Sequence, residues 1–291
     1  MEICLITGTS TGIGHATALH LARLGYKVYA SMRNAAKAGP LRERAAAENL
    51  PLVIETLDVS DNQSMLSCVQ RIIAAEGRID VLVNNAGLSS SSPIETYPED
   101  EHRAMFEANY WGPVKLTQAV LPSMCAHGRG AIVNISSLVG RLAWANQGAY
   151  CASKFAMEAF SEALAQEVAP LGIRVAIIEP GVIASAIFEN TPVHYDSASP
   201  YKSAMRRNGR FFNIGIANAT PAETVAEVIA EALSAEQPQL RYPVGFGSEI
   251  MARRAAMKDE DFIALGALDD PDYYQALRDH LGIELEPPVK D

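Results

Sequence analysis

The amino-acid sequence predicts one α/β domain over residues 1–291: a Rossmann-like, doubly wound parallel sheet of about seven strands, with helices on both faces and a C-terminal helical extension. Short apolar runs alternate with longer helical patterns along most of the chain. Parallel neighbours need such crossover helices, so the alternation favours a parallel sheet. Several runs are continuous Val, Ile and Leu, as expected of strands that are covered on both faces.

Each element is expected from its own pattern. The expected strands are Ile3–Thr7, Lys27–Ser31, Leu52–Leu57, Val81–Val83, Ala131–Ile135, Arg174–Ile178 and Gln239–Tyr242. The expected helices are Gly14–Leu24, Gln63–Glu76, Glu99–Met124, Ala149–Val168 and Ala222–Leu233. Residues 185–220 contain two prolines and several aromatic residues, so we expect a long functional loop that forms a substrate lid. Residues 243–291 form the acidic extension.

Composition excludes several classes of protein. Hydrophobic residues make up 48% and charged residues 20% of the chain, as in a folded protein with a core. The net charge of −10 argues against sequence-independent nucleic-acid binding. No apolar run approaches the roughly 20 residues of a membrane span. The four cysteines are scattered without metal-ligand spacing. We therefore expect a cytoplasmic protein with reduced thiols and no metal site.

A glycine-rich turn joins the first expected strand to the first expected helix. Gly8 permits a tight turn, Gly12 lets the backbone approach a pyrophosphate, and Gly14 lets the helix and strand pack closely. The helix N-terminus offers free N–H groups to phosphates. Glycines alone could form a plain turn, but this position between strand and helix favours a dinucleotide site.

The turn and the motifs that follow it resemble the short-chain dehydrogenase/reductase family. The match covers residues 3 to about 185, in the family's order. Its motifs are the glycine turn at 8–14, Asn84-Asn85-Ala86-Gly87, Asn109, Ser137, Tyr150 with Lys154, and Pro180-Gly181. Residues 28–33 and 241–245 most resemble the estradiol 17β-dehydrogenase and retinol dehydrogenase branch. The resemblance implies a homodimer or homotetramer packed through the helices that carry Asn109 and Tyr150.

Four polar residues are candidates for catalysis. Tyr150 and Lys154 are four residues apart and share a helix face. A nearby ammonium favours the phenolate, so we expect Lys154 to lower the Tyr150 pKa from about 10. Ser137 can donate a hydrogen bond to a substrate carbonyl oxygen. The resemblance implies that Lys154 also binds the nicotinamide ribose and that Asn109 holds a water of a proton relay. Cys151 lies next to Tyr150 but is interpreted as structural.

The distribution of charge favours NADP(H) over NAD(H). No acidic residue occurs between Glu2 and Glu43, although NAD sites place an acid about 20 residues after the glycine turn. Arg33 is placed to bind a 2′-phosphate, with Thr11 as a hydroxyl partner. A solvated basic helix face stays open as the alternative. The expected cofactor residues are Gly8, Ser10, Thr11, Gly12, Ile13, Gly14, Arg33, Asp58, Val59, Asn85, Ala86, Gly87, Tyr150, Lys154, Pro180, Gly181, Ile183 and Ser185.

The predicted reaction is hydride transfer between NADP(H) and a ketone or aldehyde, or the corresponding alcohol, with Tyr150 as acid/base. The resemblance suggests a bulky, apolar, steroid-like small molecule that contacts Ser137, Tyr150 and Phe188. Three further aromatic residues are either walls of the substrate site or plain core: Tyr195, Phe211 and Phe212. The alternative is a non-catalytic NADP(H)-binding redox sensor or scaffold protein.

Overall fold

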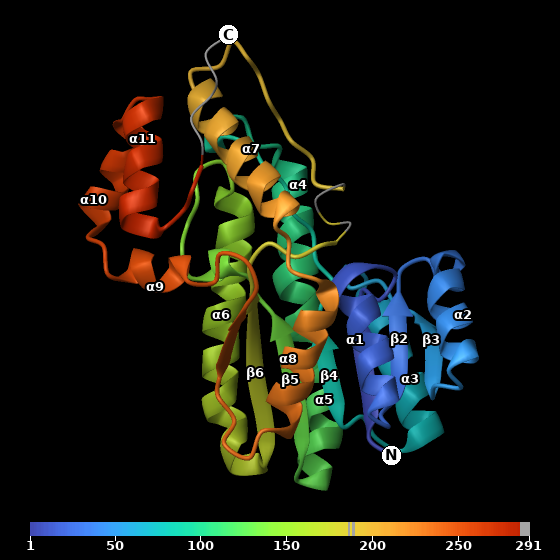
Figure 1. The fold of residues 1–291 in the computed structure, drawn as a ribbon. Helices are drawn as coiled ribbons and strands as arrows, with labels where there is room; N and C mark the ends of the chain where they lie inside the picture. The colour runs from blue at the N-terminus through green and yellow to red at the C-terminus, as the bar shows by residue number, and fades with distance from the viewer. Residues whose placement is uncertain (186, 188–189, 286–291) are drawn as a thin grey trace.

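Seven parallel strands form one sheet within residues 1–185, 187 and 190–285, the part of the chain that the computed structural model describes (Figure 1). Their order is β3-β2-β1-β4-β5-β6-β7. The strands are β1 (Ile3–Thr7), β2 (Lys27–Met32), β3 (Leu52–Thr56), β4 (Val81–Asn84), β5 (Gly130–Ile135), β6 (Ile173–Pro180) and β7 (Arg241–Val244). The predicted α/β fold class is confirmed, and each strand lies within about two residues of its expected bounds.

Eleven α-helices connect or follow these strands in the described part of the chain. They are α1 (Gly12–Arg23), α2 (Gly39–Ala47), α3 (Asn62–Glu76), α4 (Glu99–Phe106), α5 (Gly112–His127), α6 (Gly148–Val168), α7 (Lys202–Ala217), α8 (Ala222–Ser234), α9 (Ile250–Ala255), α10 (Asp259–Ala264) and α11 (Asp270–Ala276). A π-helical turn over Glu107–Trp111 separates α4 from α5, where the sequence predicted one continuous helix. None of the described helices is both long and apolar enough to cross a lipid bilayer.

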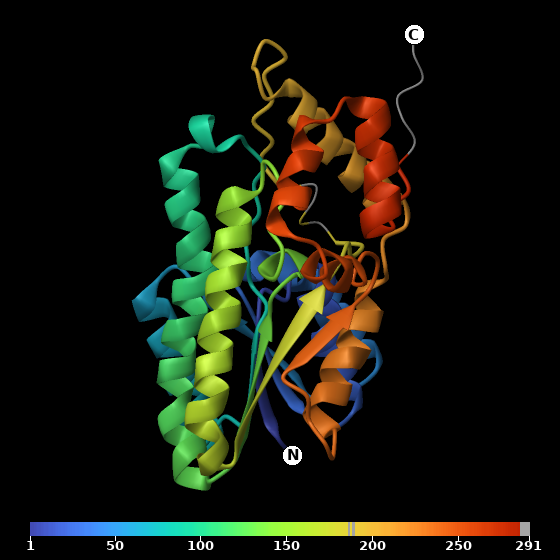
Figure 2. The ribbon, with the colours of Figure 1, turned by 90° about the vertical axis from the view of Figure 1, so that its left-hand side faces the viewer.

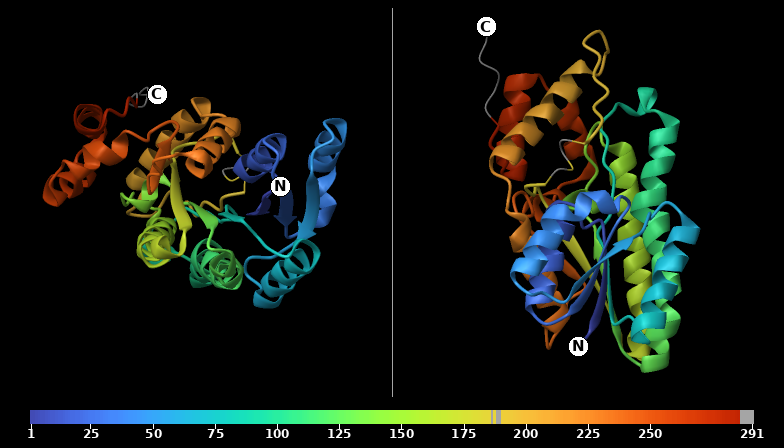
Figure 3. Two further views of the ribbon diagram at one scale, coloured as in Figure 1. Left: turned by 90° about the horizontal axis from the view of Figure 1, so that it is seen from below. Right: turned by 90° about the vertical axis from the view of Figure 1, so that its right-hand side faces the viewer.

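The sheet lies between two layers of helices (Figure 3). On one face α1 and α8 cover a core that includes Leu21, Val28 and Ile229. On the other face α3, α5 and α6 cover a core that includes Leu82 and Leu116. Burial on both faces explains why the strand sequences are continuous apolar runs.

The helix α7 and the C-terminal helices lie beyond the carboxyl ends of the strands (Figure 2). They share a third core that includes Phe211, Tyr274 and Leu281. Arg207 on α7 joins them: its guanidinium donates to Asp270 Oδ1 at 2.9 Å and to the Leu268 carbonyl at 2.6 Å. The C-terminal extension is therefore attached to α7 over the end of the sheet where a doubly wound fold binds its ligands.

The helix α7 corrects one expectation, because it lies inside the segment 185–220 that was predicted to be a loop. It buries Met205 and Phe211 together with two polar residues, Arg207 and Asn208. Both prolines that favoured a loop, at 192 and 200, precede the first residue of α7 and so leave the helix intact. Arg207 and Asn208 are buried in it although they are polar. Their burial depends on partners elsewhere in the chain, such as Ser91, whose Oγ accepts from Asn208 Nδ2 at 2.9 Å.

Candidate active site

A cavity of about 520 Å³ opens at the carboxyl ends of the strands, over the switch point between β1 and β4. The sequence-predicted residues that line it are Gly8, Ser10, Thr11, Gly12, Ile13, Arg33, Asp58, Val59, Asn85, Ala86, Gly87, Ser137, Tyr150, Lys154, Pro180, Gly181, Ile183 and Ser185. Gly14 and Asn109 lie behind its wall instead. Phe188 lies outside the described residues.

The glycine turn leaves no room for side chains at Gly8, Gly12 or Gly14. A Cβ on Gly14 would lie 2.4 Å from the Gly8 carbonyl oxygen, so this glycine lets α1 pack directly on the turn. A Cβ on Gly12 would lie 2.9 Å from the Cβ of Ser185, and Gly12 has a φ of +58°. The turn therefore meets the segment after β6 at Gly12, a contact that the sequence did not predict.

Asn85 fixes the end of β4 to the turn after β1. Its Nδ2 donates to the carbonyl oxygens of Thr7 and Gly8 at 2.8 and 3.0 Å. In return, the Thr7 hydroxyl accepts from the backbone N–H groups of Asn85 and Ala86, each at 3.0 Å. These bonds hold the floor of the cavity in place.

One end of the cavity is suited to an anionic group. Thr11 is exposed at the N-terminus of α1, and its side chain makes no capping bond. The first turn of α1 holds no acidic residue, so the helix dipole and free N–H groups face the cavity uncompensated. Arg33 is exposed after β2 and makes no hydrogen bond or ion pair with any residue that the structure describes. These residues fit the phosphates of a dinucleotide.

The catalytic candidates Tyr150 and Lys154 line the middle of the cavity from α6. Burial raises the pKa of Tyr150 to about 12, opposed by a hydrogen bond with Ser137. The expectation that Lys154 would lower this pKa is wrong here. Its Nζ lies 5.7 Å from the Tyr150 ring centroid and donates to the Ile135 carbonyl at 2.8 Å. Burial of the phenol outweighs the ammonium at that distance, so Tyr150 is protonated at neutral pH.

Asn109 is buried in the π-helical turn between α4 and α5. Its Oδ1 accepts from the Leu88 N–H at 2.8 Å, and its Nδ2 donates to the Leu88 carbonyl at 2.9 Å and to Ser153 Oγ at 3.0 Å. Ser153 Oγ donates to the Tyr150 carbonyl at 2.8 Å. Asn109 therefore joins the loop after β4 to the catalytic helix. A π-turn is a recurrent feature of functional sites, but it has no reliable signal in a single sequence.

The far end of the cavity is apolar. Phe211 and Phe212 from α7 line it, whereas Tyr195 is 55% exposed and lies outside. Sequence reasoning missed further walls, which are Leu138, Val139, Trp144 and Ile250. Trp144 lies between Ser137 and Tyr150 in the sequence, and this proximity could have indicated that it lines the site. The sequence around Ile250, on α9, gives no such indication.

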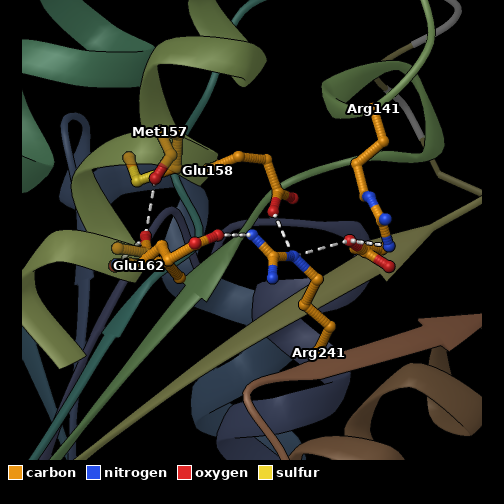
Figure 4. A network of polar contacts seen from close by, with 8 residues as sticks. Arg141, Met157, Glu158, Glu162 and Arg241 are labelled. Carbon is orange, nitrogen blue, oxygen red and sulfur yellow. Dashed lines mark hydrogen bonds and ion pairs between the residues drawn. The ribbon is translucent and has the colours of Figure 1, made fainter. Parts of the chain in front are cut away.

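Two buried carboxylates and two less buried arginines form a cluster of charges next to the site (Figure 4). It comprises Glu158 on α6, Glu179 on β6, Arg141 and Arg241. The Arg241 Nε lies 3.0 Å from Glu158 Oε2 and 3.5 Å from Glu179 Oε1, and an Arg141 nitrogen lies 3.7 Å from the same Glu179 oxygen. Burial, with the nearby Glu158 charge, raises the pKa of Glu179 to about 7. We call these four residues the Glu158 cluster.

Glu179→Gln is expected to make the protein less sensitive to alkaline pH. The folded state binds a proton on Glu179 more tightly than the unfolded state does, so raising the pH from 5 to 8 costs the wild type about 2–3 kcal/mol of unfolding free energy. The neutral amide avoids this loss. Urea unfolding at both pH values measures the difference, with Glu162→Gln as an exposed control. Parallel pH dependences in wild type and Glu179→Gln would contradict the role of Glu179.

Known proteins match this chain along most of its length. Residues 2–195 match the model of a family described as short chain dehydrogenase. The chain is 34% identical to estradiol 17-beta-dehydrogenase 1 of Rattus norvegicus, over 89% of this chain and 77% of the relative. It is also 34% identical to retinol dehydrogenase 8 of Bos taurus, over 91% of this chain and 85% of the relative.

Solved structures show the same architecture. A short-chain dehydrogenase from Streptomyces avermitilis matches with a TM-score of 0.78 and 32% identity, over 92% of this chain and 98% of that one. A metagenomic short-chain oxidoreductase in complex with NADP matches with a TM-score of 0.68 and 27% identity, over 84% of this chain and 96% of that one. With these matches added to the predicted motifs around one cavity, the chain belongs to the short-chain dehydrogenase family of oxidoreductases, related to the group of estradiol 17β-dehydrogenase and retinol dehydrogenase.

Proposed function

We propose that the protein is an NADP(H)-dependent carbonyl reductase or alcohol dehydrogenase that acts on a bulky apolar substrate. The observation that carries the proposal is the composition of one cavity. Ser137, Tyr150 and Lys154 line its middle, Arg33 lies toward one end, and Phe211 lies toward the other. A single site thus offers contacts for an anionic cofactor, a polar reacting centre and an apolar substrate body.

The proposed reaction needs two hydrogen-bonding groups at a carbonyl oxygen. Ser137 donates to that oxygen and stabilises the charge that develops on it. Tyr150, protonated at neutral pH, transfers its proton to the same oxygen. When bound, the nicotinamide cofactor supplies the hydride that adds to the carbonyl carbon, or accepts it in the reverse direction. Asn109 and Ser153 hold the backbone around Tyr150, which keeps the phenol in place.

The preference for NADP(H) rests on charge at the second strand. Arg33 lines the cavity, its guanidinium makes no ion pair within the described part of the chain, and no acid follows β2 where an NAD site would place one. A solved relative that contains NADP supports the same preference.

The class of substrate follows from the apolar end of the cavity. Phe211, Trp144 and Ile250 offer contact area to a large hydrocarbon skeleton and few hydrogen bonds. Relatives named for estradiol and retinol support this class. Nothing among those relatives favours the non-catalytic sensor.

A spectrophotometric assay tests the proposed function. NADPH absorbance is followed with a panel of steroid-like, retinoid-like and other bulky ketones and aldehydes. Small 2-keto acids, which would be reduced to hydroxy acids, are the controls. We expect oxidation of NADPH with at least one bulky carbonyl compound and little with the controls. Tight NADPH binding without turnover of any compound would contradict the proposal and favour the sensor.

We also propose that the protein forms a homodimer through α5 and α6. Trp111, the last residue of the π-helical turn before α5, and Phe155, on α6, are large apolar side chains that are 44% and 43% exposed. We expect Trp111→Glu to shift the mass measured by light scattering from dimer to monomer, because the carboxylate would be buried at the interface. Ile263→Glu on α10 is the control, at an apolar residue that is 73% exposed and lies away from α5 and α6. An unchanged mass for Trp111→Glu would exclude this interface.

A further inference from the structure

Glu158, a residue outside the predicted catalytic motifs, contributes to the electrostatic environment of Lys154. Glu158 follows Lys154 by one turn of α6, so both side chains lie on the inner face of the same helix. Both are buried, with exposed fractions of 5% and 6%. A buried lysine and a buried glutamate one turn apart interact through little water, so the charge of each affects the other.

Glu158 is fixed in place by a partner that is distant in the sequence. Arg241 on β7 donates from Nε to Glu158 Oε2 at 3.0 Å and from a terminal nitrogen to Glu162 Oε2 at 2.5 Å (Figure 4). The two glutamates differ in depth, because the Glu162 side chain is 54% exposed and that of Glu158 is 7% exposed. Arg241 therefore fixes one inner and one outer carboxylate on the same helix.

Only one oxygen of the Glu158 carboxylate is paired among the described residues. Its Oε1 is buried and makes no hydrogen bond among the described residues, and a Cβ on Gly140 would lie 3.3 Å from it. Glu179 on β6 is a second buried carboxylate, which Arg141 approaches from the segment after Ser137. At neutral pH the raised pKa of Glu179 leaves it partly protonated.

We propose that Glu158 is a positioning residue of the active site, whose carboxylate, fixed by Arg241, keeps Lys154 in its ammonium form. Lys154 would otherwise face a strong tendency to lose its proton, because burial lowers its pKa to about 8 and the Glu158 charge opposes this change. A neutral amine at this position could still form hydrogen bonds, but it would place no positive charge near the reacting carbonyl group. The inference rests on the proposed function for its consequence in catalysis, but the charge state of Lys154 can be measured separately.

Direct titration of Lys154 by NMR tests the inference without any turnover. The chain has seven lysines, so lysine labelled with ¹³C at Cε gives a spectrum in which Lys154→Arg identifies the Lys154 signal. In Glu158→Gln we expect the ammonium-to-amine ratio of Lys154 at pH 8 to fall about tenfold. Glu162→Gln, which removes the outer partner of Arg241, is the matched control and is expected to leave the ratio unchanged. Equal titrations in Glu158→Gln and wild type would overturn the proposal.

Two further measurements keep the test decisive. If Glu158→Gln does not fold, Glu158→Asp keeps the charge but draws it back by one methylene, and we expect a two- to threefold fall in the ratio; no change would reject the proposal. In steady-state assays the alkaline limb of kcat/KM should move to lower pH in Glu158→Gln but not in Glu162→Gln. A shifted Lys154 titration in a protein that reduces no carbonyl compound would reject the proposed function and leave the role of Glu158 standing.

Discussion

Tyr150→Phe is expected to lower kcat for NADPH-dependent carbonyl reduction by about a thousandfold or more, while the Kd for NADPH changes less than threefold. The substitution removes one hydroxyl, the group that carries the transferable proton, and general acids contribute roughly 10²–10⁴-fold to rates. The ring and its packing remain, so the cavity should keep its shape. Because the Tyr150 phenol is protonated at neutral pH, its loss falls on the reduction step directly.

The control for this substitution is Tyr195→Phe. It removes the same hydroxyl from a tyrosine that is 55% exposed and lies outside the cavity. We expect kcat and the Kd for NADPH to match wild type in that variant. Stopped-flow measurement of the hydride-transfer step and fluorescence titration with NADPH separate chemistry from binding. Retention of more than a tenth of the wild-type rate by Tyr150→Phe would show that another group supplies the proton.

Local sequence patterns predicted the fold and the floor of the site. Continuous Val, Ile and Leu runs mark strands that are buried on both faces, and the structure places helices on both faces of the sheet. Gly14 was predicted to allow close packing of helix and strand, and a Cβ at this position would lie only 2.4 Å from the Gly8 carbonyl oxygen. Such features are predictable because their cause lies within a few neighbouring residues.

Features that depend on distant residues were not predictable. The burial of Asn208 and Arg207 on α7 is one such feature, because their hydrogen-bond partners lie more than 50 residues away in the chain. The pKa of Tyr150 was expected to fall, but burial by segments far apart in the chain raises it. The role of Glu158 likewise depends on Arg241, which lies 83 residues away in the chain.

Arg33→Ala is expected to weaken NADPH binding by about 30- to 100-fold and NADH binding by less than threefold. The guanidinium is exposed, lines the cavity, and makes no ion pair with the described residues, so its charge is available to a 2′-phosphate. Charge-assisted hydrogen bonds of this kind contribute about 2–3 kcal/mol. NADH carries a hydroxyl where NADPH carries that phosphate, so the same loss should barely affect it. Isothermal titration with both cofactors gives the two Kd values.

The control for Arg33→Ala must separate a local contact from the general positive charge of this region. Residues 3–42 carry five basic residues and no acid, so any cofactor phosphate is attracted to this region at long range. Arg42→Ala removes the same charge from α2, where the side chain is exposed and does not line the cavity. If both substitutions weaken NADPH equally, the preference arises from the diffuse field and Arg33 has no specific role. If only Arg33→Ala does so, and it spares NADH, the 2′-phosphate is bound by that one guanidinium.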